Sequence, residues 1–234
     1  MGHFLHEFFS PLDFLRSTPF IWSGFKLNLE LMVVAEAFIL VLALLIAIVR
    51  GLPGRAALPL RAAAIFYTDV FRGTPLLLVL FIVQGFATLN YAGLSSETLF
   101  RNGAIALVLV YTAYVTEVYR AGIESVHPSQ RMAARSLGLS YMQALRYVVL
   151  PQAIRRVIPP LLNDFIGLQK DTVLVTTIGL TESLAQANFF DTDYANFTAL
   201  TVTAVFFIFL TIPLARFTDH IIRQRERKER AQAA

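Results

Sequence analysis

Long apolar runs are the feature of this sequence that most constrains its fold. A helix needs about 20 mostly apolar residues to cross a bilayer. The chain holds five such segments, at 27–49, 58–89, 102–122, 153–180 and 197–222. Only 15% of the 234 residues are charged, whereas soluble domains carry about 25%. The sequence therefore predicts an all-α integral membrane protein with about five transmembrane helices.

The second and fourth apolar runs contain helix-breaking residues. RGTP at 72–75 divides the second run, because Pro75 cannot donate to the preceding turn and Gly73 lowers the cost of unwinding. We therefore expect two helices with a break between them. Pro159 and Pro160 weaken the fourth run. In transporters, such breaks expose backbone groups that bind small polar solutes.

The apolar runs place most of the chain in one transmembrane domain, 27–222. Residues 1–26 are rich in aromatic side chains and lack the pattern of a cleaved signal peptide, so we expect them at the extracytoplasmic interface. Residues 223–234 form a basic tail that anionic lipid would attract. The absence of cysteine excludes disulfides, and the four histidines show no metal-ligand spacing.

Lysine and arginine are distributed unevenly between alternate loops. If the N-terminus lies outside, the outer segments contain only Arg16, Lys26 and Arg101, and all the other basic loop residues lie inside. Short cytoplasmic loops are enriched in basic residues. We therefore expect an extracytoplasmic N-terminus, a cytoplasmic C-terminus and a cytoplasmic loop at 123–152.

The polar segment RMAARSLGLSYMQALRYVVLP at 131–151 is predicted to form two short helices around one glycine. Ser129 can cap a first helix over 130–137. Gly138 can end that helix in the left-handed conformation, which glycine adopts at little cost. An elbow of this kind between membrane spans is expected to be a docking element.

The second helix of this elbow is predicted over 141–150. Ser140, with Gln143 three residues later, has the spacing of a capping box. Pro151 is expected to end the helix, because proline has no backbone N–H to continue the hydrogen-bond ladder.

The elbow resembles the cytoplasmic EAA loop of the membrane subunits of ATP-binding-cassette (ABC) importers. That pattern is Glu-Ala-Ala, three residues, Gly, nine residues, Ile, one residue, Leu-Pro. The matching positions are Ala133, Ala134, Gly138, Val148, Leu150 and Pro151. Four blocks resemble permeases for polar amino acids: TDVFRGTPLLL at 68–78, AYVTEVYRAGIESV at 113–126, LPQAIRRVIPPLLNDF at 150–165 and LQKDTVLV at 168–175.

Two positions depart from the EAA pattern. Val148 replaces its isoleucine, and Met132 replaces its glutamate. A glutamate at 132 would be the third residue of the predicted helix and could close a capping box with Ser129. Methionine gives up that bond but suits an apolar docking cleft.

The resemblance implies a type I importer-like permease subunit in the bacterial cytoplasmic membrane. Such a subunit is not an enzyme. It pairs with an identical or related permease, receives solute from an extracytoplasmic solute-binding protein, and works by alternating access. Two cytoplasmic ATPase subunits would hold the ATP and Mg, because this chain has no phosphate-binding loop and is expected to hold no cofactor. The residues implied in ATPase coupling are Ala133, Ala134, Gly138, Leu150 and Pro151.

Charges within apolar runs are costly and are therefore candidate solute contacts. The candidates are Asp69, Arg72, Glu117, Lys170 and Asp171. A structural explanation stays open for all five, and Asp69–Arg72 and Glu117–Arg120 have the spacing of local ion pairs. Lys170 and Asp171 point about 100° apart, so at least one needs a partner elsewhere. The candidates suit a polar amino acid, with a slight preference for a cationic one.

A second hypothesis is a secondary amino acid transporter driven by an ion gradient. It would explain Glu36 in the first apolar run without any ATPase. It also predicts internal repeats, which are not evident in five spans, and it leaves the elbow without a role. A membrane scaffold, the third hypothesis, gives no reason for Lys170 and Asp171 to lie in lipid.

Overall fold

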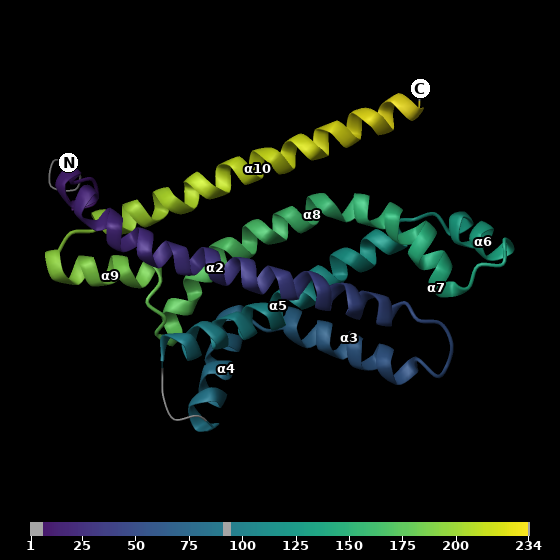
Figure 1. Ribbon diagram of the computed structural model, residues 1–234, viewed down its shortest axis with the longest axis horizontal. Coiled ribbons are helices and arrows are strands. Elements are labelled where there is room, and N and C mark those ends of the chain that lie inside the picture. The colour runs from purple at the N-terminus through teal and green to yellow at the C-terminus, as the bar shows by residue number, and fades with distance from the viewer. Residues whose placement is uncertain (1–6, 91–94, 234) are drawn as a thin grey trace. The chain divides into compact units, whose positions relative to one another are not determined.

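The computed structural model describes residues 7–90 and 95–233, and the side chains of 7–89 and 95–224. Every regular element among these residues is helical, which confirms the predicted all-α fold (Figure 1). The elements are α2 (Pro11–Arg50), α3 (Leu58–Gly73), α4 (Leu76–Asn90), α5 (Ser96–Glu124), α6 (Pro128–Ser136), α7 (Tyr141–Ala144), the π-helix η1 (Leu145–Val149), α8 (Leu150–Asp171), the 3₁₀-helix η2 (Thr172–Ile178), α9 (Ser183–Tyr194) and α10 (Thr198–Ala233).

Three described helices are long and apolar enough to cross a membrane: α2, α5 and Thr198–Gln224 of α10. The bent pair α3 and α4 raises the number to four if the pair counts as one span. Because α8 is not among these described candidates, a count of five spans stays a prediction. The helix that holds the first apolar run begins at Pro11, well before residue 27. The Ser10 hydroxyl accepts from the Asp13 N–H at 3.4 Å, and proline is favoured at a first helical position.

The break predicted in the second apolar run is confirmed. Helix α3 ends at Gly73, Thr74 is extended (φ −105°, ψ 128°), and α4 begins at Leu76. The Thr74 hydroxyl donates to the Val70 carbonyl at 2.8 Å. That bond satisfies one of the carbonyls that the end of α3 leaves without a helical partner.

The fourth apolar run changes helix type along its length. Pro159 and Pro160 lie inside α8, which continues to Asp171. The chain then tightens into η2, and Gly179 ends η2 in the left-handed conformation, with φ 98°. This positive φ is a conformation that glycine adopts readily.

The chain packs as two units. The first comprises Met1–Ala37, Pro75–Val108 and Phe165–Phe217, and the second comprises Phe38–Thr74, Leu109–Asp164 and Thr218–Ala234. Helices α2, α5, α8 and α10 each contribute one part to each unit. The two units are described separately below.

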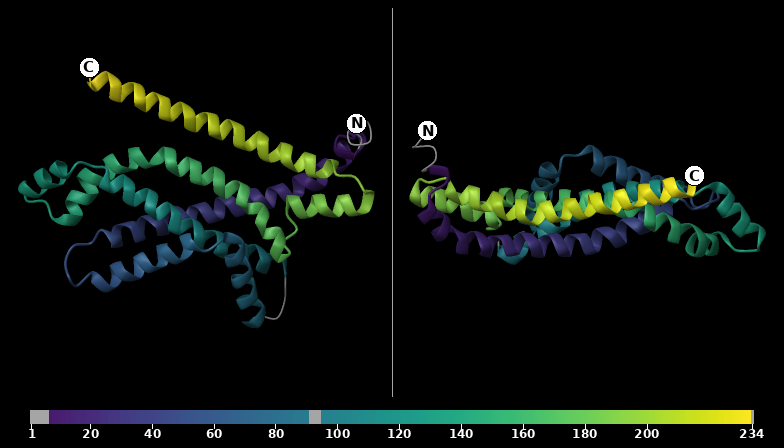
Figure 2. Two further views of the ribbon diagram at one scale, coloured as in Figure 1. Left: turned by 180° about the vertical axis from the view of Figure 1, so that it is seen from behind. Right: turned by 90° about the horizontal axis from the view of Figure 1, so that it is seen from above.

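In the first unit, α9 lies beside the beginnings of α2 and α10 (Figures 1 and 2). Their shared core consists of Ile21, Ala187, Phe190, Ala199 and Val202. The Phe25 ring packs against Phe206 and Phe207, with ring centroids 5.4 Å and 5.1 Å away. Burial of these large apolar side chains stabilises the unit.

A neutral hydrogen-bond network, which we call the Asn28 network, joins α2 to the segment around η2. Asn28 is 2% exposed. Its Oδ1 accepts from the backbone N–H of Ser183 at 3.2 Å and from the Ser183 hydroxyl at 2.7 Å. Its Nδ2 donates to the Thr172 Oγ1 at 3.2 Å. A side chain on Gly24 would meet the backbone of Glu182 and Ser183 at 2.5 Å, so only glycine allows this close approach.

Glu182 belongs to the same network and caps α9. Its carboxylate accepts from the N–H groups of Leu184 and Ala185 at 2.9 Å and 3.1 Å. Full burial raises the pKa of the Glu182 carboxyl, although these hydrogen bonds oppose the shift. Glu182 therefore both begins α9 and brings one ionisable group into an otherwise neutral network.

Candidate functional site

The first elbow helix, α6, begins two residues earlier than the sequence predicts. His127, and not Ser129, is its N-cap, and the His127 Nδ1 accepts from the Ser129 N–H at 3.2 Å. Pro128 takes the first helical position, where its missing N–H costs nothing and its fixed φ suits the helix. The predicted Ser129 cap is therefore wrong. Met132 then lies beyond the third helical position, so a glutamate there could not close the predicted capping box.

The glycine of the elbow adopts the predicted conformation. Gly138 has φ 84° and follows the C-cap Leu137. The Gly138 N–H donates to the Arg135 carbonyl at 3.0 Å, and the Leu139 N–H donates to the Ala134 carbonyl at 3.2 Å. These two bonds form a Schellman motif, which ends a helix by satisfying its last carbonyls.

The second elbow helix starts as predicted and ends differently. The capping box is present, with the Gln143 N–H donating to the Ser140 Oγ at 3.2 Å and the Ser140 N–H donating to the Gln143 Oε1 at 2.8 Å. The predicted stop at Pro151 is wrong, because α7 runs through the π-helix η1 into α8.

The π-helix explains how a helix passes through Pro151. The Leu150 N–H donates to the carbonyl of Leu145, five residues back. In this wider turn the backbone hydrogen bonds span five residues in place of four, so the regular α-helical pattern is already interrupted before Pro151. The Gln152 side chain donates to the Val148 carbonyl at 3.0 Å, which supplies a side-chain donor at this irregular turn.

The elbow has a buried face and an exposed face. Figure 1 shows α6 and α7 folded back on each other between the end of α5 and the start of α8. Val126, Leu145, Val149 and Ala153 form the core below them. Among the motif positions, Ala134 is buried, Leu150 is half-buried, and Ala133, Gly138 and Pro151 are exposed. The exposed face carries large apolar side chains, namely Met132, Leu137, Met142 and Tyr147. Leu137 is 84% exposed, so this face resembles an unoccupied protein interface.

The second unit also contains a cluster of charges, which we call the Glu117 network. Glu117 accepts from Arg50 of α2 and from Arg120 Nε, the latter at 2.8 Å. Arg72 of α3 lies 3.7 Å from the same carboxylate. One carboxylate of α5 therefore joins guanidinium groups from α2, α3 and its own helix. The Glu117 side chain is 16% exposed.

The Glu117 network changes the expected local pairs. The Glu117–Arg120 pair is confirmed, whereas Arg72 pairs with Glu117 and not with Asp69. Asp69 is exposed, and its carboxylate makes no ion pair or hydrogen bond within the described part of the chain. Arg50 had no sequence signal as a partner, because it comes from a helix 67 residues away.

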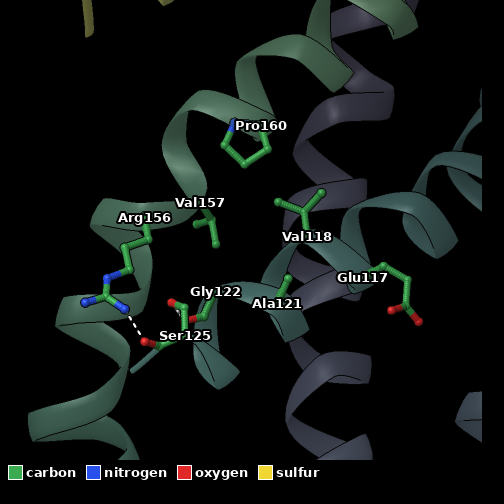
Figure 3. Close-up of a pocket in the computed structure, with 8 residues that line it drawn as sticks. All are labelled: Glu117, Val118, Ala121, Gly122, Ser125, Arg156, Val157 and Pro160. Atoms are coloured by element: carbon green, nitrogen blue, oxygen red, sulfur yellow. Dashed lines mark hydrogen bonds between the residues drawn. The ribbon is translucent and has the colours of Figure 1, made fainter. Parts of the chain in front are cut away.

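A cavity of about 410 Å³ lies between α5 and α8 in the second unit. Figure 3 shows Val118 and Gly122 of α5 opposite Val157 and Pro160 of α8. The Arg156 guanidinium donates to the Ser125 carbonyl, and it points away from the Glu117 carboxylate. A side chain on Gly122 would overlap Val157, so this glycine allows α5 and α8 to pack closely.

Lys170 and Asp171 belong to the first unit, so they lie in a different packing unit from Asp69, Arg72 and Glu117. Lys170 is exposed and Asp171 is half-buried. The structure therefore brings Arg72 and Glu117 together, while Asp69 makes no bond to either of them.

Two polar side chains of α8 were missed by the sequence analysis. Asp164 has a buried Oδ2 without a hydrogen-bond partner among the described residues. Gln169 accepts from the Thr211 hydroxyl at 2.9 Å through Oε1, but its buried Nε2 has no described partner either. Unsatisfied buried polar atoms are costly, so both side chains are candidates for solute contact. The sequence signal was their position in an apolar run beside Pro159 and Pro160.

The described residues contain no group of three or more His, Cys, Asp or Glu side chains that could hold a metal ion. The candidate features are the elbow, with its left-handed Gly138 and its exposed apolar side chains, the Glu117 network, and the unsatisfied polar atoms on α8. These features suit movement of a solute and docking of a partner.

Comparison with known proteins places this arrangement in a family. The chain is 34% identical to the putative glutamine transport system permease protein of Rickettsia bellii (strain RML369-C) over 206 residues, covering 88% of this chain and 92% of the relative. It is 36% identical to the arginine transport system permease protein of Bacillus subtilis (strain 168) over 179 residues, covering 75% and 80%.

Two solved structures have the same fold. The crystal structure of an amino acid ABC transporter with histidines matches with a TM-score of 0.80 and 31% identity, over 91% of this chain and 97% of the other. An inward-facing structure of a methionine ABC transporter matches with a TM-score of 0.72 over 87% and 95%, at 17% identity.

Residues 54–227 match the family described as the binding-protein-dependent transport system inner membrane component. The match covers most of the chain and includes the whole elbow. This chain therefore belongs to that family, as a permease subunit of a bacterial ABC importer and not an enzyme.

Proposed function

We propose that this chain moves a polar amino acid across the bacterial cytoplasmic membrane by alternating access. The elbow is the observation that carries the proposal. Its Gly138 turn holds two short helices so that Met132, Leu137 and Met142 stay exposed for a partner. Closure of ATPase subunits on ATP would move this elbow, and ATP would favour one state only through its different contacts in the two states.

The assembly that we propose contains two permease subunits, identical or related, and two cytoplasmic ATPase subunits. An extracytoplasmic solute-binding protein delivers the amino acid. ATP and Mg bind to the ATPase subunits and not to this chain. The residues that couple the permease to the ATPase are Ala133, Ala134, Gly138, Leu150 and Pro151.

The orientation is part of the same proposal. The N-terminus is extracytoplasmic, residues 1–26 lie at that interface, and 27–222 form the transmembrane domain. The elbow within 123–152 and the basic tail at 223–234 are cytoplasmic. The distribution of lysine and arginine supports this orientation.

The solute is an amino acid with a polar side chain, with a slight preference for a cationic one. The curated relatives compared above are named for glutamine and arginine. The proposed contacts are Asp69, Arg72, Glu117, Lys170 and Asp171, to which we add Asp164 for its buried, unsatisfied Oδ2. Three arginines already engage Glu117, so it would act by positioning Arg72.

Uptake into proteoliposomes tests the solute assignment. The assembled complex is offered one labelled amino acid against a panel of competing neutral and cationic ones. Asp171→Asn keeps the size of the side chain and removes its charge, so it should reduce uptake and leave basal ATP hydrolysis intact. Asp69→Asn should change the preference between cationic and neutral amino acids more than the rate. If both variants match the parent, specificity lies with the binding protein.

ATP hydrolysis tests the coupling. The purified chain alone should hydrolyse no ATP, and a soluble ATPase should co-purify on co-expression. Gly138→Val forces a β-branched residue to positive φ, which costs about 1–2 kcal/mol, and should abolish solute-stimulated hydrolysis while membrane insertion stays normal. Gly138→Asn is the matched control, because asparagine tolerates this conformation. Parental transport by Gly138→Val would refute the role of the elbow.

A further inference from the structure

A second cavity in the second unit has the character of an anion site. It measures about 310 Å³ and lies where the end of α2, α3, the end of α5 and the elbow meet. Arg50, Arg120 and Arg131 line it, together with Glu124 and Tyr141. Tyr141 ties the elbow to α2, because its hydroxyl donates to the Gly51 carbonyl at 2.5 Å.

The charges around this cavity do not balance. Arg50 and Arg120 both bind Glu117, and Arg120 also binds Glu124 at 2.5 Å. Arg131 is half-buried, yet its guanidinium group makes no ion pair or hydrogen bond within the described part of the chain. Glu117 and Glu124 therefore pair with Arg50 and Arg120, whereas neither carboxylate pairs with Arg131. A partly buried cation without a counter-charge is unfavourable unless an anion binds it.

The lining of the cavity favours a phosphate group attached to an apolar body. A guanidinium group presents a fork of N–H donors that matches phosphate oxygens. The walls that are not charged include Ala47, Ile65 and Ile123. Free phosphate would make no favourable contact with the apolar walls, whereas the acyl chains of a phospholipid would pack against them.

The surrounding surface supports a lipid. The turn between α2 and α3 adds Arg55, which is exposed, and Arg61, which donates to the carbonyls of Leu52 and Gly54 at 3.2 Å and 3.3 Å. In the proposed orientation this turn faces the cytoplasmic leaflet, where anionic lipids attract basic residues.

We propose that this cavity binds the phosphate group of an anionic phospholipid, with Arg131 as its main ligand. The lipid bridges the elbow and the end of α2, so it stabilises the elbow in the position that the Tyr141–Gly51 bond also favours. The proposal does not depend on which amino acid is carried, but it does use the cytoplasmic orientation of the elbow.

Lipid exchange in the assembled permease–ATPase complex tests the site. Spin-labelled phosphatidylglycerol and phosphatidylcholine are compared for immobilised lipid per complex. The parent should hold phosphatidylglycerol several-fold more strongly than phosphatidylcholine. Arg131→Gln should remove most of this preference, and Arg131→Lys, which keeps a phosphate-binding charge, should restore part of it. Arg155→Gln is the matched control, because the Arg155 side chain is exposed, makes no hydrogen bond or ion pair within the described residues and lies outside the cavity.

The outcomes separate the sources of phosphate. Equal retention of phosphatidylglycerol by the parent and Arg131→Gln overturns the proposal, as does a parent without any preference. If inorganic phosphate displaces the labelled lipid from the parent but not from Arg131→Gln, the lipid assignment is overturned in favour of free phosphate. If Arg155→Gln lost the preference for phosphatidylglycerol to the same extent, the net charge of the protein and not this cavity would attract the lipid, and the proposed site would be overturned.

Discussion

The Asn28 network of the first unit and the Glu117 network of the second tie helices together with opposite chemistry. Asn28 is 2% exposed and makes hydrogen bonds to neutral groups of Thr172 and Ser183. Glu117 is 16% exposed and binds three guanidinium groups whose side chains reach solvent to different extents. Neutral groups can be sealed from water once their hydrogen bonds are made, whereas charges keep a large desolvation penalty.

The difference teaches how each network can respond to a conformational change. In the Asn28 network the amide uses its Oδ1 and an Nδ2 hydrogen in directed bonds, which define one geometry. In the Glu117 network the three arginines share two oxygens, and Arg72 at 3.7 Å is held less closely than Arg120 at 2.8 Å. The Asn28 network therefore holds its helices in one geometry, whereas the arginines of the Glu117 network can exchange positions on the carboxylate.

The largest effect should come from removing the central carboxylate. Glu117→Gln leaves Arg50, Arg72 and Arg120 without their shared counter-charge, and should destabilise the chain by about 3 kcal/mol, as in other broken, partly buried ion pairs. Thermal unfolding of the detergent-solubilised protein measures this. Glu124→Gln is the control, because the exposed Glu124 pair should contribute about 0–1 kcal/mol. Equal melting temperatures for the two variants would remove the distinction between shared and simple pairs.

A smaller loss should follow from breaking the neutral network. Asn28→Ala leaves the buried Ser183 N–H without an acceptor, which should cost about 2 kcal/mol. The same unfolding assay applies, with Ser23→Ala as a control, because the exposed Ser23 hydroxyl bonds only to the local Phe20 carbonyl. A cost for Asn28→Ala no greater than that of the control would show that water reaches the network.

The two networks should also differ in how their contributions to stability depend on salt concentration. Raising the ionic strength shortens the Debye length from about 10 Å at 0.1 M to about 3 Å at 1 M. The destabilisation by Glu117→Gln should therefore shrink in high salt, because part of the network is exposed. The destabilisation by Asn28→Ala should not change. A parallel response of both variants would contradict their assignment as charged and neutral.

The smallest effect concerns pH and the one ionisable group of the Asn28 network. Because burial raises the pKa of Glu182, the folded state holds its proton more tightly than the unfolded state. The contribution of Glu182 to stability is then present at acidic pH and is lost as pH rises through the raised pKa. The melting temperature of the parent should fall relative to Glu182→Gln over this range. A difference that grows in the opposite direction would mean that the carboxylate is charged and satisfied by its N–H donors.

Turns and helix caps that depend on neighbouring residues were mostly predicted correctly from the sequence. Gly138 and the Ser140–Gln143 capping box depend on residues within a few positions of one another, so their spacing carried enough information. The cap of α6 failed because the combination of His127 and Pro128 competes with Ser129, and a serine is the more familiar cap. The break at 72–75 succeeded because Gly73 and Pro75 act on their own backbone.

Pairing between helices could not be predicted. The i, i+3 rule favoured Asp69 for Arg72, but Glu117 from another helix is the partner that the fold supplies. Arg50 and Asn28 became notable only through packing, because their partners lie far away in the chain. Asp164 lies in an apolar run, but that its Oδ2 is buried and unsatisfied depends on its neighbours in the fold.

The π-helix before Pro151 has a mechanical consequence. A π-turn holds about one residue more than an α-turn, so it advances the angular phase of everything after it by about 100°. The directions in which Val157 and Asp164 point, relative to the elbow, therefore depend on the one extra residue in the π-turn. Deleting one residue of Leu145–Val149 would let the segment relax to a regular α-helix and would rotate α8 about its axis relative to the elbow. The side chains of α8 therefore face a direction, relative to the elbow, that an uninterrupted α-helix of the same sequence would not give them.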